Sequence, residues 1–128
     1  MIISKNRKVL IGVKDKDIRK GVFIIPSSVT HIGDSAFANC RSLVEVIIPD
    51  SVTSIGDYAF AECGSLKNLT ISNFVTHIGD FAFMRCINLT KVIIPYSVTR
   101  IRCGVFFMCR GLTKVFIPDS VTYIGDGA

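Results

Sequence analysis

A 23-residue period runs through the chain almost without slippage, and it constrains the fold more than any other feature. Three residue types recur at this spacing: Pro26, Pro49, Pro95 and Pro118; Cys40, Cys63, Cys86 and Cys109; Phe37, Phe60, Phe83 and Phe106. The unit reads I-P-x-S-V-T-x-I-G-D-x-A-F-x-x-C-x-x-L-x-x-V-x. A repeat of this length is typical of a solenoid, in which each unit buries its apolar side by stacking on its neighbours.

Apolar residues fall in fixed columns that predict the inward positions of each coil. In the first full unit these columns hold Val29, Ile32, Leu43, Val46 and Ile48. The last two positions alternate with period 2, which predicts a half-buried strand. With 49% hydrophobic residues, the composition suffices to fill such coils as one elongated domain.

The segment G-D-x-A-F-x-x-C lies between the two apolar stretches and predicts a short helical turn. Its aspartates are Asp34, Asp57 and Asp80. Each can accept the free backbone N–H groups at the start of such a turn. Ala36, Phe37 and Cys40 stand at helical spacing and are expected to face inward together.

These units resemble the BspA-like (Treponema-type) leucine-rich repeats over residues 24–128. The resemblance rests on S-V-T-x-I-G-D-x-A-F, the strand segment and the single cysteine of each unit. It implies a right-handed leucine-rich-repeat superhelix with a parallel β-sheet on the concave face, and short helical turns and short strands elsewhere. It also implies a secreted or cell-surface protein of a host-associated microbe, active in adhesion and in binding host extracellular or cell-surface proteins.

Residues 1–23 fall outside the period and predict an N-terminal cap, whereas residues 24–128 hold the repeats. Two apolar runs, residues 2–4 and 9–13, flank the polar residues 5–8, as in a β-hairpin over the first coil. The last repeat is incomplete, because the sequence stops at Ala128 where the repeat has phenylalanine. We therefore expect a longer parent protein and an open C-terminal coil that favours self-association.

Neither a membrane span nor a leader sequence is predicted in this chain. No run of 18 apolar residues occurs, so membrane insertion is not expected. A signal peptide is not indicated either, because Met1–Ser4 leads directly into the basic residues 5–8 without a long apolar core.

The net charge of +5 resides in the first twenty residues, which carry seven basic and two acidic side chains. A basic patch can attract nucleic acid or an anionic surface. Aromatic residues that stack on bases are missing from this stretch, which favours a solvated cap over a nucleic-acid site.

The four repeat cysteines admit three interpretations, of which buried free thiols fit best. A metal site lacks a C-x-x-C pair or a nearby histidine. A disulfide is disfavoured because side chains in one column point inward in parallel. Cys103 differs, because it occupies the aspartate column and is expected to be exposed. It can form an intermolecular disulfide or reflect neutral drift.

The polar residues give no indication of catalysis, a metal or a cofactor. His31 and His77 stand two rungs apart in a surface column, about 10 Å on sheet spacing, too far to share one ion. Serines and threonines conform to the repeat, whereas an active site needs an irregular cluster. The threonine column that begins at Thr30 predicts a hydroxyl ladder that satisfies backbone groups.

The outward face of the sheet is the candidate partner-binding site. Two neighbouring columns make up this predicted site. One is a mainly apolar column of Ile47, Thr70, Ile93 and Phe116, and the other is a polar column of Asn68, Lys91 and Lys114. An exposed apolar stripe often marks a contact site, although β-branched residues also suit strands by propensity alone. Asn68 and Asn88 begin N-x-T sequons, and a glycan on Asn68 would argue against use of this face.

The sequence thus predicts a protein-binding or adhesion module that uses the sheet face, with no enzymatic activity. Ile47, Ile93 and Phe116 are the expected anchors, and Lys91 and Lys114 the orienting charges. The alternative is a structural spacer or self-associating segment of a longer surface protein.

Overall fold

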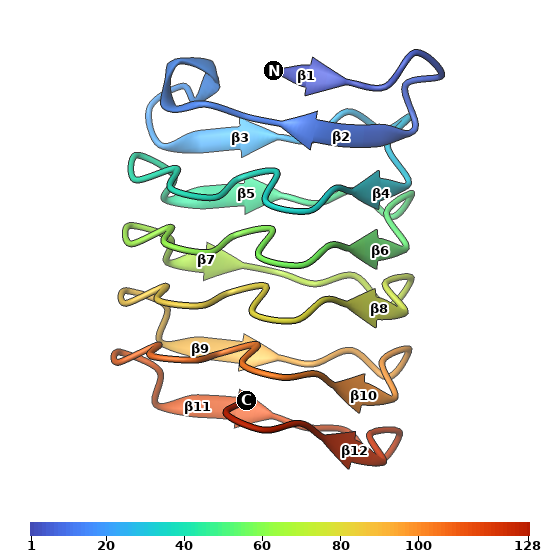
Figure 1. Ribbon diagram of the computed structural model, residues 1–128, viewed down its shortest axis with the longest axis vertical. Helices are drawn as coiled ribbons and strands as arrows, with labels where there is room; N and C mark the ends of the chain where they lie inside the picture. The colour runs from blue at the N-terminus through green and yellow to red at the C-terminus, as the bar shows by residue number, and fades with distance from the viewer.

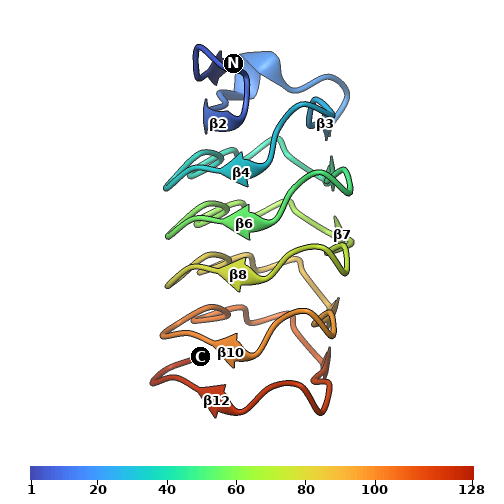
Figure 2. The same ribbon diagram turned by 90° about the vertical axis from the view of Figure 1, so that its right-hand side faces the viewer.

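The computed structural model describes residues 1–128 as a single stack of coils, each contributing one short strand to each of two faces (Figure 1). The first face holds β3 (Val22–Ile24), β5 (Glu45–Ile47), β7 (Asn68–Leu69), β9 (Lys91–Ile93) and β11 (Lys114–Phe116). The second face holds β2 (Val9–Gly12), β4 (His31–Ile32), β6 (Ser54–Ile55), β8 (His77–Ile78), β10 (Arg100–Ile101) and β12 (Tyr123–Ile124). Paired neighbours within each face run parallel, so the predicted solenoid is confirmed (Figure 2).

The N-terminal segment forms the predicted hairpin over the first coil. Strand β1 (Ile2–Ile3) pairs antiparallel with β2, which pairs parallel with β4. A 3-10 turn at Asp15–Asp17 follows, and both of its aspartates make polar contacts with other segments. The Asp15 carboxylate accepts hydrogen bonds from the Ser42 backbone N–H at 3.1 Å and hydroxyl at 2.8 Å. The Met1 ammonium lies 2.7 Å from the Asp17 carboxylate.

One apolar core runs through the whole stack. It comprises 30 buried residues, and the predicted inward positions Ala36, Phe37 and Cys40 are among them. The phenylalanine rings stack from coil to coil, with centroids 4.7 Å apart for Phe37 and Phe60 and 5.3 Å apart for Phe60 and Phe83. Such aromatic pairs add about 1 kcal/mol beyond the burial of their area.

The predicted helical turns are wrong, because the G-D-x-A-F-x-x-C segments form successive tight turns instead of helices. Ser35 and Asn39 adopt positive φ angles of 55° and 63°. With the chain turned in this way, the N–H groups of Ser35, Phe37 and Asn39 donate to carbonyls of the next coil at 2.7 to 2.9 Å. A helix would keep these donors within its own turn. The coil-to-coil ladder therefore replaces the helix.

The aspartates of these turns also act between coils, which corrects their predicted capping role. Asp34 Oδ1 accepts the backbone N–H of Asp57 at 2.8 Å, and Asp57 Oδ1 accepts that of Asp80 at 2.8 Å. The predicted threonine ladder is confirmed except at Thr99, whose hydroxyl does not bond to Thr76. The Thr53 hydroxyl donates to the Thr30 carbonyl at 3.3 Å, and the Thr76 hydroxyl donates to the Thr53 carbonyl at 3.3 Å.

Both faces are interrupted at one junction, between the coil of β7 and β8 and the coil of β9 and β10. The first face divides into β3-β5-β7 and β9-β11, and the second into β1-β2-β4-β6-β8 and β10-β12. Figure 1 shows the wider spacing at this junction. The turn segments of the two coils remain hydrogen-bonded to each other across this junction. The Phe81 N–H donates to the Cys103 carbonyl at 2.9 Å, and the Phe83 N–H donates to the Val105 carbonyl at 3.0 Å. We call this junction the seam.

Arg102 explains the seam, because it occupies a column that otherwise holds glycine. A Cβ built on Gly56 would lie 2.5 Å from Asp34 Oδ1 and 2.7 Å from the Asp34 backbone nitrogen, closer than real Cβ atoms approach. Arg102 carries a Cβ, so its coil cannot approach its neighbour at the usual spacing. Its Nε instead lies 3.2 Å from Asp80 Oδ1, the oxygen whose counterparts bind the next coil.

The substitution Arg102→Gly is predicted to close the seam and stabilise the fold. The regained backbone hydrogen bonds contribute about 1 kcal/mol each. The loss of an exposed ion pair and the entropy of glycine cost about 1 kcal/mol each at most. We expect the free energy of unfolding to rise by about 2 kcal/mol, measured by urea denaturation.

Gly56→Ala is the matched control, since it adds a Cβ at a closed junction. We expect it to lower the free energy of unfolding by about 2 kcal/mol through strain between the coils. If Arg102→Gly is instead destabilising while Gly56→Ala is neutral, steric separation by the side chain does not cause the seam.

Candidate partner-binding face

The structure places all seven predicted site residues on the outward side of the first face. Four lie in the central column, Ile47, Thr70, Ile93 and Phe116, and three lie beside them, Asn68, Lys91 and Lys114. All are exposed, with exposed fractions of 45% for Ile47, 56% for Ile93 and 52% for Phe116. Alternation along each strand directs these side chains outward, because their neighbours in the strand fill the core.

The seam divides these residues into two groups, which the sequence did not indicate. Register pairs Glu45 with Asn68 in the first group, next to Ile47. In the second group it pairs Lys91 with Lys114 and Ile93 with Phe116. The predicted stripe is therefore two patches separated by a break in the sheet.

The second group forms an aromatic and cationic patch with a hollow of about 350 Å³. The Lys91 ammonium lies 5.6 Å from the centroid of the Phe116 ring, within range of a cation–π contact. Tyr96 also lines the hollow and is 76% exposed. Sequence reasoning missed Tyr96. Its column holds aspartate at Asp50 and Asp119, so an aromatic residue there departs from the repeat and could have indicated a binding residue.

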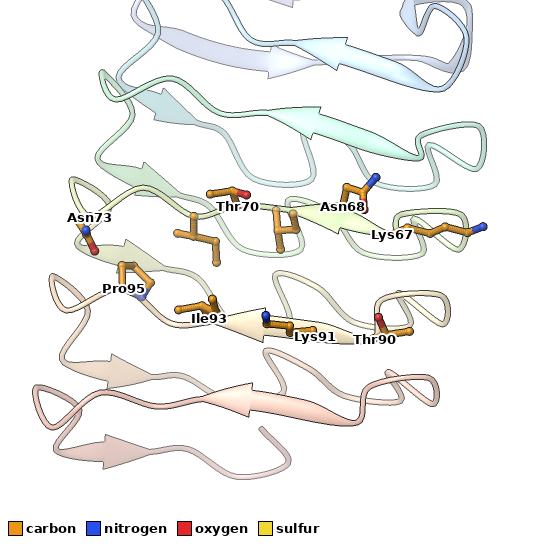
Figure 3. Close-up of a pocket in the computed structure, with 10 residues that line it drawn as sticks. Lys67, Asn68, Thr70, Asn73, Thr90, Lys91, Ile93 and Pro95 are labelled. Carbon is orange, nitrogen blue, oxygen red and sulfur yellow. The ribbon is translucent and has the colours of Figure 1, made fainter.

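A larger hollow, about 520 Å³, lies at the seam itself. In Figure 3, Asn68 and Thr70 lie on one wall and Lys91 and Ile93 on the other. Its full lining is Lys67, Asn68, Leu69, Thr70, Ile71, Asn73, Thr90, Lys91, Ile93 and Pro95. It thus brings together four predicted site residues, and it adds Thr90 and Asn73, which sequence reasoning missed.

The electrostatic character of both hollows is basic. Neither lining includes an aspartate or a glutamate, whereas Lys67 and Lys91 line the seam hollow and Lys91 also lines its neighbour. Lys114 pairs with Lys91 across the ladder and adds a third cation. The C-terminal half of the face therefore complements an acidic surface.

The repeat cysteines are buried free thiols, as predicted. The Cys63 thiol donates to the Phe37 carbonyl at 3.1 Å, and its counterparts in later coils make equivalent bonds. Burial raises the pKa of Cys40 to about 11, with the Asp15 charge adding to the effect. Burial likewise raises the pKa of Cys63 to about 12.

Cys103 is half-buried, whereas the sequence predicted an exposed thiol. It lies in a hollow of about 100 Å³ with Asp80, Arg100, Arg102 and Tyr123. The neighbouring coils account for the partial cover, because Asp57 and Asp80, its counterparts in other internal coils, are half-buried as well.

The sequence predicts neither a metal site among the acidic, histidine and cysteine side chains nor a membrane span. No group of three or more His, Cys, Asp or Glu side chains could hold an ion. His31 and His77 lie on exposed positions of the second face, with Ser54 between them in the ladder. None of the helices has the length and apolar character needed to cross a membrane.

Thiol chemistry tests this arrangement of the cysteines. At pH 8 we expect Ellman's reagent to modify Cys103 alone in the folded chain, because the four buried thiols stay protonated and covered. All five cysteines should react in denaturant. Cys103→Ser should abolish the fast phase; a fast phase that survives this substitution would show that a repeat cysteine is accessible.

The stacked coils define a class of repeat solenoid, and sequence comparison identifies the family. The model of the BspA type leucine rich repeat region matches residues 17–128 in six copies. The chain belongs to this family. The match indicates a protein-interaction or surface module, and neither it nor the site geometry points to catalysis.

Solved structures agree with this assignment. A leucine rich repeat protein of T. pallidum is 35% identical with a TM-score of 0.74, over 78% of this chain and 47% of that one. A leucine rich cell surface protein from Faecalibacterium prausnitzii is 42% identical with a TM-score of 0.76, over 82% of this chain and 29% of that one.

The pneumococcal vaccine antigen PcpA shares the fold alone, at 19% identity and a TM-score of 0.86 over 97% of this chain and 32% of that one. The chain therefore spans less than half the length of these three structures. None of the curated proteins compared with this chain matches it.

Proposed function

We propose that this chain is a protein-binding module that acts in adhesion and holds its partner on the first face. The observation that carries the proposal is the exposure of Ile93 and Phe116 side by side on paired strands, next to Lys91 and Lys114. Exposed aromatic and aliphatic anchors with cations at their edge are typical of protein interfaces. Ile47 and Thr70 extend the contact across the seam.

The proposed location is the cell surface or the secreted fraction, and the proposed partner is a host extracellular or cell-surface protein. The F. prausnitzii relative is a leucine rich cell surface protein, which supports this location. The continuous core and the coil-to-coil hydrogen bonds support the partner class, because a preformed surface binds a folded protein without the entropy cost of ordering itself.

Charge substitution on the face tests the proposal. Ile93→Glu combined with Phe116→Glu should reduce binding to purified extracellular matrix proteins at least tenfold, measured on biosensor surfaces, because the apolar anchors are lost. The control is Ile87→Glu, which alters an isoleucine of similar exposure, 50%, in another hollow. Equal binding by both variants, with unchanged circular dichroism, would sink the proposal.

A structural spacer or self-associating segment is the second candidate, and the C-terminal end of the stack favours it. A hollow of about 290 Å³ there is lined by eight hydrophobic residues, among them Phe106, Leu112 and Ile124. Ile124 is 57% exposed, although its counterpart Ile101 is buried. A second copy of the chain stacked on this end would cover these apolar side chains.

Light scattering over a range of concentrations separates these functions. For the binding module we expect a monomer with and without reductant. A dimer that Ile124→Lys dissociates would support self-association through the terminal coil, because the substitution places a charge in the apolar contact. A dimer that dissociates in reductant would instead implicate Cys103.

A further inference from the structure

The closed junctions of the first face share one backbone arrangement. At each of them, two successive N–H groups donate to a single carbonyl oxygen of the preceding coil. Lys67 and Asn68 donate to Val44 at 2.9 and 3.2 Å, and Thr113 and Lys114 donate to Thr90 at 2.9 and 3.3 Å. Such a pair of neighbouring donors converges on one acceptor.

At the seam this pair of donors has no acceptor. The equivalent N–H groups belong to Thr90 and Lys91, and neither donates to Lys67 or to any other protein group. Both residues line the 520 Å³ hollow, so the donors border a space large enough for a ligand group. Backbone donors without a protein partner require water or a ligand.

The surroundings favour an anion as the acceptor. Lys67 and Lys91 line the same hollow, together with the Asn68 amide and the Thr90 hydroxyl, and no acidic side chain does. Figure 3 shows Lys91 on the same strand as Ile93, whereas the Lys67 side chain extends away from the other labelled side chains. A carboxylate that accepts backbone N–H groups and pairs with an ammonium makes charge-assisted hydrogen bonds, about twice as strong as neutral ones.

We propose that the seam hollow receives a carboxylate side chain from an acidic segment of a protein partner. One carboxylate oxygen accepts the N–H groups of Thr90 and Lys91, and the Lys91 ammonium neutralises the charge. Ile93 borders this hollow and the adjacent one, so the carboxylate enters next to the apolar anchors. The inference rests on the proposed function and names the chemistry of its partner.

The test uses a blocked five-residue peptide with a central glutamate, titrated into the ¹⁵N-labelled chain. The amide signals of Thr90 and Lys91 should shift with the peptide concentration, whereas those of Thr113 and Lys114, which are already bonded, should not. The same peptide with a central glutamine is the matched control. The free Lys67 carbonyl on the opposite wall could attract an amide, so equal shifts with the glutamine peptide would overturn the proposal.

Arg102→Gly supplies an independent test, because closing the seam consumes both N–H groups while leaving the apolar anchors in place. We expect this variant to lose the shifts, and Lys91→Gln to weaken the peptide at least fivefold. Shifts that persist in Arg102→Gly would contradict the assignment to the seam. If Ile93→Glu abolishes binding to matrix proteins while Arg102→Gly does not, the proposed function stands and the carboxylate site fails. If the peptide shifts the amide signals but the chain binds no matrix protein, the carboxylate site stands and the proposed function fails.

Discussion

The hydrogen-bond ladder between successive coils is the interaction on which the rest of the structure depends. A single coil has too few residues to enclose its own apolar side chains, so the core exists only where coils are held at ladder spacing. The turn segments show its strength, because they adopt positive φ angles at Ser35 and Asn39 that direct their N–H groups to the next coil. The same spacing sets the stacking of Phe37 on Phe60 and places each cysteine thiol beside a carbonyl of the neighbouring coil.

The spacing leaves no room for a Cβ at the glycine column, and this steric limit links Arg102 to the candidate partner-binding face. Both faces part at its coil, yet the turn ladder continues through Phe81 and Phe83, so the core remains stacked. Arg102, next to the second face, thus leaves the backbone N–H groups of Thr90 and Lys91 exposed on the first face. The candidate site combines an apolar patch around Ile93 with a polar, basic hollow beside it.

Most of the fold could be predicted from the sequence, because the period sets which residues share a column. Val29, Phe37 and Cys40 were predicted to be buried, and they are. The helical turn was wrong, since apolar residues at positions 1, 2 and 5 of a segment fit a helix and a row of tight turns equally well. The seam could not be predicted, although Arg102 stood out as a departure from the repeat. The effect of Arg102 depends on the distance between its Cβ and the backbone of the preceding coil. The sequence of one repeat unit does not reveal this distance between coils.

Native-state amide hydrogen exchange of the unmodified chain tests the central claim most directly. Thr90, Lys91 and Thr99 lie at the seam without ladder bonds, and Thr113, Lys114 and Thr122 are their bonded counterparts one coil later. We predict that the first three amides exchange faster than their counterparts by about a hundredfold or more, as for amides open to solvent in a stable core. Equal protection of the two sets would show that the ladder continues through Arg102, and would contradict both the seam and the site built on it.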